Sequence, residues 1–69
     1  MITVTIIEDD ATVLQRLIDV VSASSACQIV GIGRNRGESV SAILANRADI
    51  YLVDLGLPDV DGIDLIKLI

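Results

Sequence analysis

The sequence predicts an α/β fold with a doubly wound parallel sheet, and three observations lead to this prediction. Short apolar runs rich in β-branched residues occupy positions 2–7, 27–32 and 50–53. Segments with the apolar spacing of helices separate these runs, so the element order is strand, helix, strand, helix, strand. Acidic residues directly follow the first and third runs. Because right-handed crossovers join parallel strands, this order predicts one parallel sheet with helices against it.

The first apolar run leads into an amphipathic helix. Residues 2–7 place threonines among Ile and Val, as strands often do, and Asp10 stands where a helix N-cap is expected. From Ala11 onward, four apolar residues recur at the spacing of one helix face: Leu14, Leu17, Ile18 and Val21. We expect this helix to end in the small polar residues 22–25, which compete for backbone hydrogen bonds.

The middle of the chain predicts a second strand and a second helix. Residues 27–32 form the strand, in which Cys27, the only cysteine, is expected to be a small buried hydrophobe. Three glycines within residues 31–37 predict a flexible connection. A second helix, marked by Val40, Ile43 and Leu44, is expected to run to about Asn46.

The last part of the chain predicts a third strand and the start of a third helix. The strand covers residues 50–53, between two aspartates. Asp61 is the expected N-cap of a helix that begins at about Ile63, with Asp64 in a capping-box position. The chain stops after about two turns without a C-cap signal, so we expect a truncated chain. The alternative is a short protein whose exposed Leu65, Ile66, Leu68 and Ile69 are buried against another subunit.

Composition narrows the possible functions. The chain has 69 residues, enough for one domain, and an apolar share of 52% that excludes disorder. No uncharged apolar run reaches about 18 residues, so we expect no membrane span. No basic segment precedes the first apolar run, so we expect no secretory signal. A cytoplasmic location follows as the default. The net charge of −5 argues against direct binding of nucleic acids.

The acidic residues point to a cation site. They are concentrated at positions 8–10 and 54–64, and parallel strands bring their carboxyl ends to the same edge of the sheet. In a sheet of strand order 2-1-3, Glu8, Asp9 and Asp54 would lie close together. Carboxylates repel one another, and a hard divalent cation such as Mg²⁺ relieves the repulsion. Zinc and copper would lack suitable ligands, because the chain has no histidine.

Two motifs carry a resemblance to a known family. Ile6-Ile-Glu-Asp-Asp10 and Tyr51-Leu-Val-Asp-Leu-Gly-Leu-Pro-Asp-Val-Asp-Gly62 resemble the acidic pair and the phosphoacceptor segment of bacterial response regulator receiver domains. The resemblance covers all 69 residues and implies a flavodoxin-like receiver fold, truncated after the third strand and the start of the third helix. Residues 1–69 would then form the first half of the receiver domain.

The resemblance implies a phosphorelay function rather than an enzyme. Asp54 would accept a phosphoryl group from a sensor histidine kinase, and the product would be an aspartyl phosphate. Mg²⁺ would be held by Asp9 and Asp54, by the backbone carbonyl of Gly56, and by Glu8 directly or through water. The parent protein would commonly regulate transcription. The hydroxyl residue, lysine and aromatic residue that family members carry on later strands do not follow Asp54 here, and Lys67 is expected to be a solvated helix residue.

Two alternatives remain at this point. Without further strands, the third strand is a sheet edge and the third helix is apolar, which favours an assembly module that forms oligomers through these elements. Gly31, Gly33 and Gly37 resemble a dinucleotide fingerprint, with Arg34 and Arg36 nearby, but their spacing and their place after the second strand do not fit it.

Overall fold

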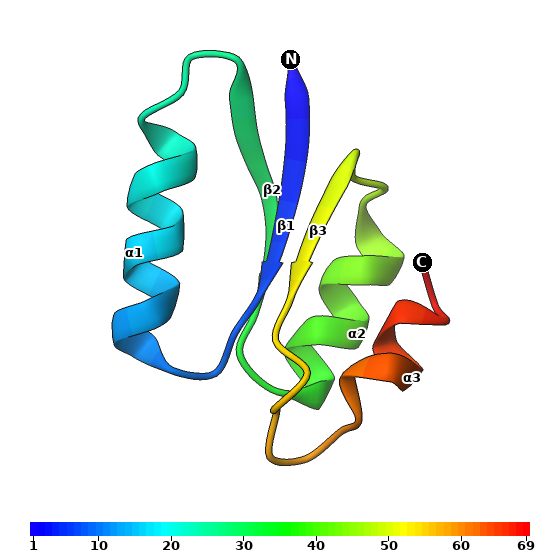
Figure 1. The fold of residues 1–69 in the computed structure, drawn as a ribbon. Coiled ribbons are helices and arrows are strands. Elements are labelled where there is room, and N and C mark those ends of the chain that lie inside the picture. Colours follow the sequence, from blue (N-terminus) through cyan, green and yellow to red (C-terminus); the bar gives the residue numbers. More distant parts are fainter.

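A computed structural model describes all 69 residues and contains one three-stranded parallel sheet (Figure 1). The elements are β1 (Ile2–Ile7), α1 (Ala11–Ser22), β2 (Cys27–Gly33), α2 (Arg36–Ala45), β3 (Ile50–Val53) and α3 (Gly62–Ile66). The strand order is β2-β1-β3, and both pairings are parallel. The α/β prediction is confirmed. No helix combines the length and apolar character needed to cross a membrane.

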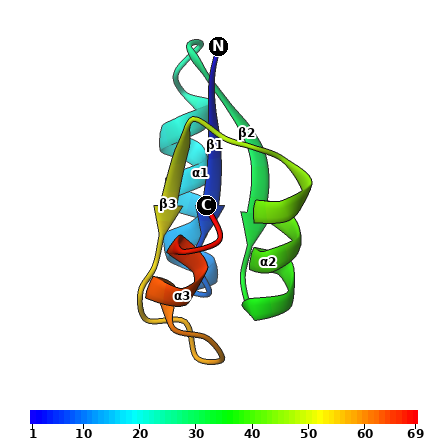
Figure 2. The same ribbon diagram turned by 90° about the vertical axis from the view of Figure 1, so that its right-hand side faces the viewer.

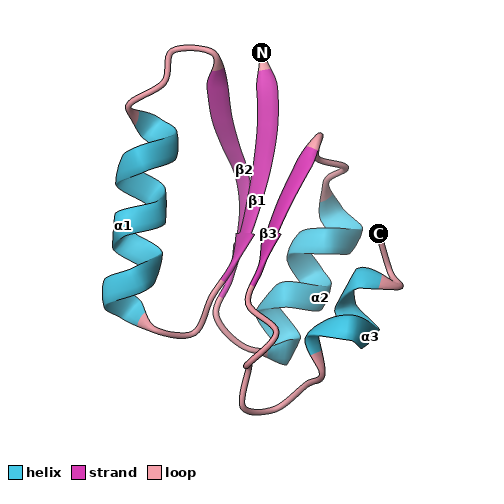
Figure 3. Ribbon diagram, viewed as in Figure 1, coloured by secondary structure: helices cyan, strands magenta, loops and turns pink.

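Helices cover the two faces of the sheet unequally, as Figures 2 and 3 show. α1 lies alone on one face, and α2 and α3 lie on the other (Figure 1). The side chains of β1 pack on both faces of the sheet, because successive strand residues point in opposite directions. Val4 and Ile6 pack with Leu14 under α1. Ile7 packs with Ile43 of α2 and with two residues beyond β3, namely Leu57 and Leu65.

The helix starts match the acidic caps predicted from the sequence. The Asp10 carboxylate accepts the N–H groups of Thr12 and Val13 at 2.9 and 3.0 Å. The Asp61 carboxylate accepts the Ile63 N–H at 2.9 Å. The predicted capping box of α3 is wrong, however, since the Asp64 carboxylate lies 3.9 Å from Lys67 Nζ on the exposed side of the helix.

Two other predictions are corrected by the packing. Residues 31–37 are not a flexible connection, because β2 continues to Gly33 and α2 begins at Arg36. Leu65 is not exposed: α3 folds back over the sheet and buries this side chain to 1% exposure. The neighbouring Ile66, Leu68 and Ile69 remain exposed, as expected.

Gly33 has no side chain because α2 passes too close to β2 for one. A Cβ at Gly33 would lie 2.5 Å from both Cα and Oγ of Ser39. Ser39 is itself fully buried, so it cannot move aside into solvent. A Cβ at Gly37, in the first turn of α2, would meet nothing nearer than Asn35 Oδ1 at 3.6 Å. The first glycine is therefore required by packing and the second is not.

We predict opposite effects for alanine at these two glycines. Gly33→Ala should destabilise the fold by about 1 to 3 kcal/mol through overpacking against Ser39. Gly37→Ala should stabilise it by about 0.4 to 1 kcal/mol, because alanine reduces the freedom of the unfolded chain. Urea unfolding of both variants measures the difference. Equal effects would contradict the close contact between β2 and α2.

A polar clamp fixes the amino-terminal end of β3 beside β1. The Asp49 carboxylate accepts the backbone N–H of Thr3 at 2.9 Å and its hydroxyl at 3.1 Å. In return, the Asp49 N–H donates to the Thr3 carbonyl at 3.0 Å. The backbone N–H of Thr3, and then its hydroxyl, hold the pKa of Asp49 below its ordinary value of 3.8. The ionised carboxylate therefore favours the folded state.

We predict that this clamp makes a pH-dependent contribution to stability. Since the folded-state pKa is lowered, the contribution is complete above pH 3.8 and is lost as the pH falls through the depressed value. Asp49→Asn should lower the unfolding free energy at neutral pH, and its difference from the native chain should shrink in acid. Denaturation measured between pH 2 and pH 7 checks this. A difference that stays constant with pH, or an equal one in the control Asp19→Asn on α1, would contradict the clamp.

Candidate functional site

The sheet places two acidic residues side by side at its carboxyl end. The ladder between β1 and β2 continues one residue past β1, where the Glu8 N–H donates to the Gly33 carbonyl at 2.9 Å. The ladder between β1 and β3 continues in the same way, where the Asp54 N–H donates to the Ile7 carbonyl at 2.9 Å. Glu8 and Asp54 are thus the first residues beyond neighbouring strands, and the backbone fixes their positions.

Three carboxylates meet at this end of the sheet. Glu8, Asp9 and Asp54 each offer one oxygen, and these oxygens all lie within 4.8 Å of one another. Glu8 and Asp54 are partly buried, and Asp9 is exposed. The sequence predicted this convergence from the element order together with a strand order of 2-1-3, which the structure has. Asp10 is not a member of the cluster and instead caps α1, as predicted.

Backbone N–H groups orient two of these carboxylates. Asp54 Oδ1 accepts the Gly56 N–H at 2.8 Å, which closes a tight turn directly after β3. A Cβ at Gly56 would lie 3.3 Å from the same oxygen, so glycine leaves this oxygen uncrowded. On the other side, Glu8 Oε2 accepts the Asp10 N–H at 3.3 Å. The Gly56 N–H is thus the backbone donor to the Asp54 carboxylate.

The two partly buried carboxyl groups have pKa values shifted in opposite directions. Partial burial raises the pKa of Glu8, and the neighbouring Asp54 carboxylate raises it further. The Gly56 N–H holds the pKa of Asp54 below its ordinary value, and sharing of a proton with Glu8 contributes in the same direction. Asp54 is therefore the member of the pair that stays ionised more readily.

The donor set suits a small hard cation. Three carboxylate oxygens within 4.8 Å can share one ion, and Mg²⁺ prefers a few carboxylates completed by water. Carboxylates this close repel one another, and a divalent cation would relieve that repulsion. Neither a histidine nor Cys27 lies in the cluster, so the ligand chemistry does not suit zinc.

The loop of residues 54–62 is anchored at several points. Leu57 is buried with Ile7 of β1 in the core under α2 and α3. At the end of the loop, a Cβ at Gly62 would lie 2.7 Å from Leu55 Cα, so α3 can begin this close to the loop only with glycine. The Asp59 carboxylate reaches across to α2 and accepts the Arg36 N–H. We did not predict Leu57 and Asp59 from the sequence, because their partners lie far away in the chain.

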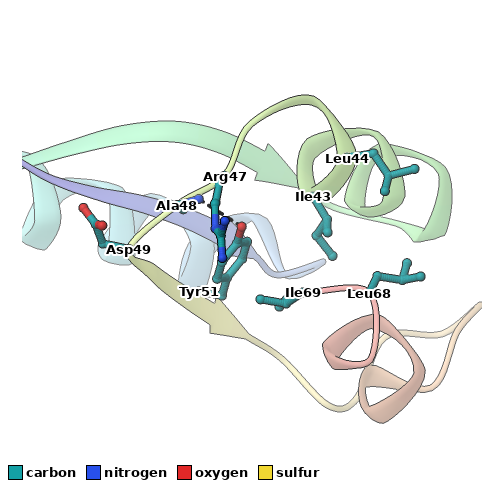
Figure 4. Close-up of a pocket in the computed structure, with 8 residues that line it drawn as sticks. All are labelled: Ile43, Leu44, Arg47, Ala48, Asp49, Tyr51, Leu68 and Ile69. Atoms are coloured by element: carbon teal, nitrogen blue, oxygen red, sulfur yellow. Dashed lines mark hydrogen bonds between the residues drawn. The ribbon is translucent and has the colours of Figure 1, made fainter.

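A hollow at the other end of β3 is unrelated to the acidic cluster. It lies between the carboxyl end of α2, Tyr51 of β3 and the residues that follow α3, as Figure 4 shows. Its lining residues are Ile43, Leu44, Arg47, Ala48, Asp49, Tyr51, Leu68 and Ile69. The Tyr51 hydroxyl accepts the Ala48 N–H at 2.9 Å. Six of its eight lining residues are hydrophobic, and it offers no cluster of catalytic groups.

The glycine-rich segment does not form a phosphate-binding loop. Gly31 and Gly33 belong to β2, and Gly37 belongs to α2. Arg34 pairs with Glu38, with 3.2 Å between Nε and Oε1. The dinucleotide alternative therefore has no loop of the required kind.

The fold and the cluster together define a class of domain. A parallel α/β sheet with helices on both faces is a doubly wound domain, and here it carries an acidic cluster at the carboxyl ends of its central and third strands. The family model for the response regulator receiver domain matches residues 4–69. The chain therefore belongs to the response regulator receiver family.

Curated relatives cover nearly the whole chain but are much longer. A protein-glutamate methylesterase/protein-glutamine glutaminase from Pseudomonas aeruginosa is 31% identical over 96% of this chain, which spans 18% of that relative. The DNA-binding transcriptional activator DevR/DosR from Mycobacterium tuberculosis is 30% identical over 97% of this chain, which spans 31% of that relative. A methylesterase/glutaminase from Thermotoga maritima is 26% identical over the whole chain. No solved structure was found to match.

Proposed function

We propose that the chain is the phosphoacceptor module of a two-component phosphorelay, with Asp54 as the residue that is phosphorylated. The observation that carries the proposal is the cluster of Glu8, Asp9 and Asp54 at the carboxyl end of the sheet. Membership of the receiver family supports the same role. The phosphodonor would be a histidine kinase, and the reaction would take place in the cytoplasm.

Each member of the site has a distinct proposed role. Asp9 and Asp54 would bind Mg²⁺ through carboxylate oxygens, Gly56 through its backbone carbonyl, and Glu8 directly or through water. Mg²⁺ would neutralise charge on the incoming phosphoryl group, which the carboxylates alone would repel. The Gly56 N–H holds Asp54 Oδ1 at 2.8 Å, and Oδ2 would be the attacking oxygen.

The proposed reaction transfers one phosphoryl group. A carboxylate oxygen of Asp54 attacks the phosphorus of a phosphohistidine, and an O–P bond forms as the P–N bond breaks. The bonding electrons of the P–N bond return to the imidazole nitrogen, which takes up a proton. The lowered pKa of Asp54 keeps the attacking carboxylate ionised, as the reaction requires.

The output of the whole protein is a separate proposal. The relatives include enzymes that act on protein glutamate and glutamine side chains and an activator that binds DNA. The chain spans less than a third of these proteins. A transcription output would fit the second relative, and the net charge of −5 argues that these 69 residues would not themselves contact DNA.

We predict that Asp54 alone accepts phosphate from a small phosphodonor. Native mass spectrometry after incubation with Mg²⁺ and acetyl phosphate should show a single phosphoryl adduct. The adduct should disappear in Asp54→Asn, which keeps the size of the side chain, and persist in Asp64→Asn, which removes an exposed acid from α3. An adduct that survives in Asp54→Asn would show that the acceptor has been misassigned.

Self-assembly is a second candidate function, favoured by a specific surface. β3 pairs only with β1, so its outer edge is free. Beside this edge, a second hollow is lined entirely by apolar residues: Tyr51, Val53, Leu55, Ile66 and Ile69. A free edge next to an apolar surface favours pairing with a second copy. The same spectra report the number of subunits: a folded oligomer without adduct would favour assembly, and a folded monomer would exclude it.

A further inference from the structure

One long-range contact ties the loop after β3 to α2. The Asp59 carboxylate accepts the Arg36 N–H with both oxygens, at 3.0 and 3.1 Å. Arg36 is the first residue of α2, and Asn35 is the N-cap. The carboxylate that satisfies this N–H therefore comes from a segment 23 residues further along the chain.

The contact is electrostatically favourable. The first N–H groups of a helix have no partners within the helix, and they create a partial positive charge that attracts carboxylates. The Asn35 side chain accepts the Glu38 N–H at 2.9 Å, so it satisfies a different group of the same turn. α2 is thus capped twice, once by its own N-cap and once by Asp59.

Asp59 belongs to the same loop that leaves the acidic site. It follows Gly56, the proposed carbonyl ligand, by three residues, and it follows the buried Leu57 by two. At its start the loop is held by the Gly56 N–H on Asp54. Asp59 provides the hydrogen bond that joins the middle of this loop to α2.

We propose that Asp59 is a positioning residue for the cation site, an inference that rests on the proposed function. Its bond to Arg36 holds the loop so that the Gly56 carbonyl can join Glu8, Asp9 and Asp54 around one Mg²⁺ ion. Coupling between two binding events is reciprocal. Binding of Mg²⁺ therefore strengthens the hydrogen bond between the Asp59 carboxylate and the Arg36 N–H. The Arg36 N–H should then be better protected when Mg²⁺ is bound.

Calorimetric titration with MgCl2 tests the positioning role. Asp59→Ala should weaken Mg²⁺ binding about 10-fold, as loss of groups that orient metal ligands commonly does. Asp59→Asn should lose less, because its amide oxygen still accepts from the Arg36 N–H. Asp64→Ala removes the same charge from an exposed position on α3 and should bind Mg²⁺ like the native chain.

Amide hydrogen exchange, measured with and without Mg²⁺, tests the coupling. Mg²⁺ should slow exchange of the Arg36 N–H, and this effect should vanish in Asp59→Ala. An Arg36 exchange rate that Mg²⁺ does not change, or equal Mg²⁺ affinities in Asp59→Ala and Asp64→Ala, would overturn the inference and leave the proposed function standing. Failure of the native chain to bind Mg²⁺ would overturn both.

Discussion

The central strand β1 is the constraint on which the rest of this structure depends. It is hydrogen-bonded to β2 on one side and to β3 on the other, and its side chains form the core on both faces of the sheet. Ile6 and Ile7 are almost completely buried on opposite faces, so a slip by one residue would exchange the faces of all side chains of the strand and disrupt the packing of both cores. The register fixed in this way also fixes where Glu8 emerges, because the ladders continue one residue beyond β1.

The chemistry of the site follows from crowding at the end of that strand. Three carboxylates within 4.8 Å of one another repel, and partial burial together with the neighbouring Asp54 raises the pKa of Glu8. A stable apolar core tolerates this repulsion, and a bound divalent cation would reverse it. The Gly56 N–H lowers the pKa of Asp54, whereas the pKa of Glu8 is raised, so Asp54 is the acid that ionises more readily. The same loop continues to Asp59, so the backbone that serves the acidic site also touches α2.

Local patterns predicted most of the fold, and the errors at Gly33 and Leu65 share one physical cause. The bounds of β3 and the caps Asp10 and Asp61 depend on nearby residues and were predicted from spacing alone. The convergence of the acids was also predictable, because parallel strands end at the same edge of the sheet. Gly33 was misread as part of a flexible loop. Glycine is required there because α2 packs closely against β2, and this contact cannot be seen in the neighbouring sequence. Burial of Leu65 and the Asp59 contact likewise depend on residues far along the chain.

The most direct test of this account is whether Mg²⁺ stabilises the fold through the three carboxylates. Thermal unfolding should be followed in MgCl2 and in NaCl of equal ionic strength. A cation that binds only the folded state stabilises it by about 2.7 kcal/mol at 100 times its Kd, so the native chain should melt higher in MgCl2. The gain should disappear in Asp9→Asn, which removes one proposed ligand. Equal melting in the two salts, or an undiminished gain in Asp9→Asn, would contradict a cation site at the end of β1.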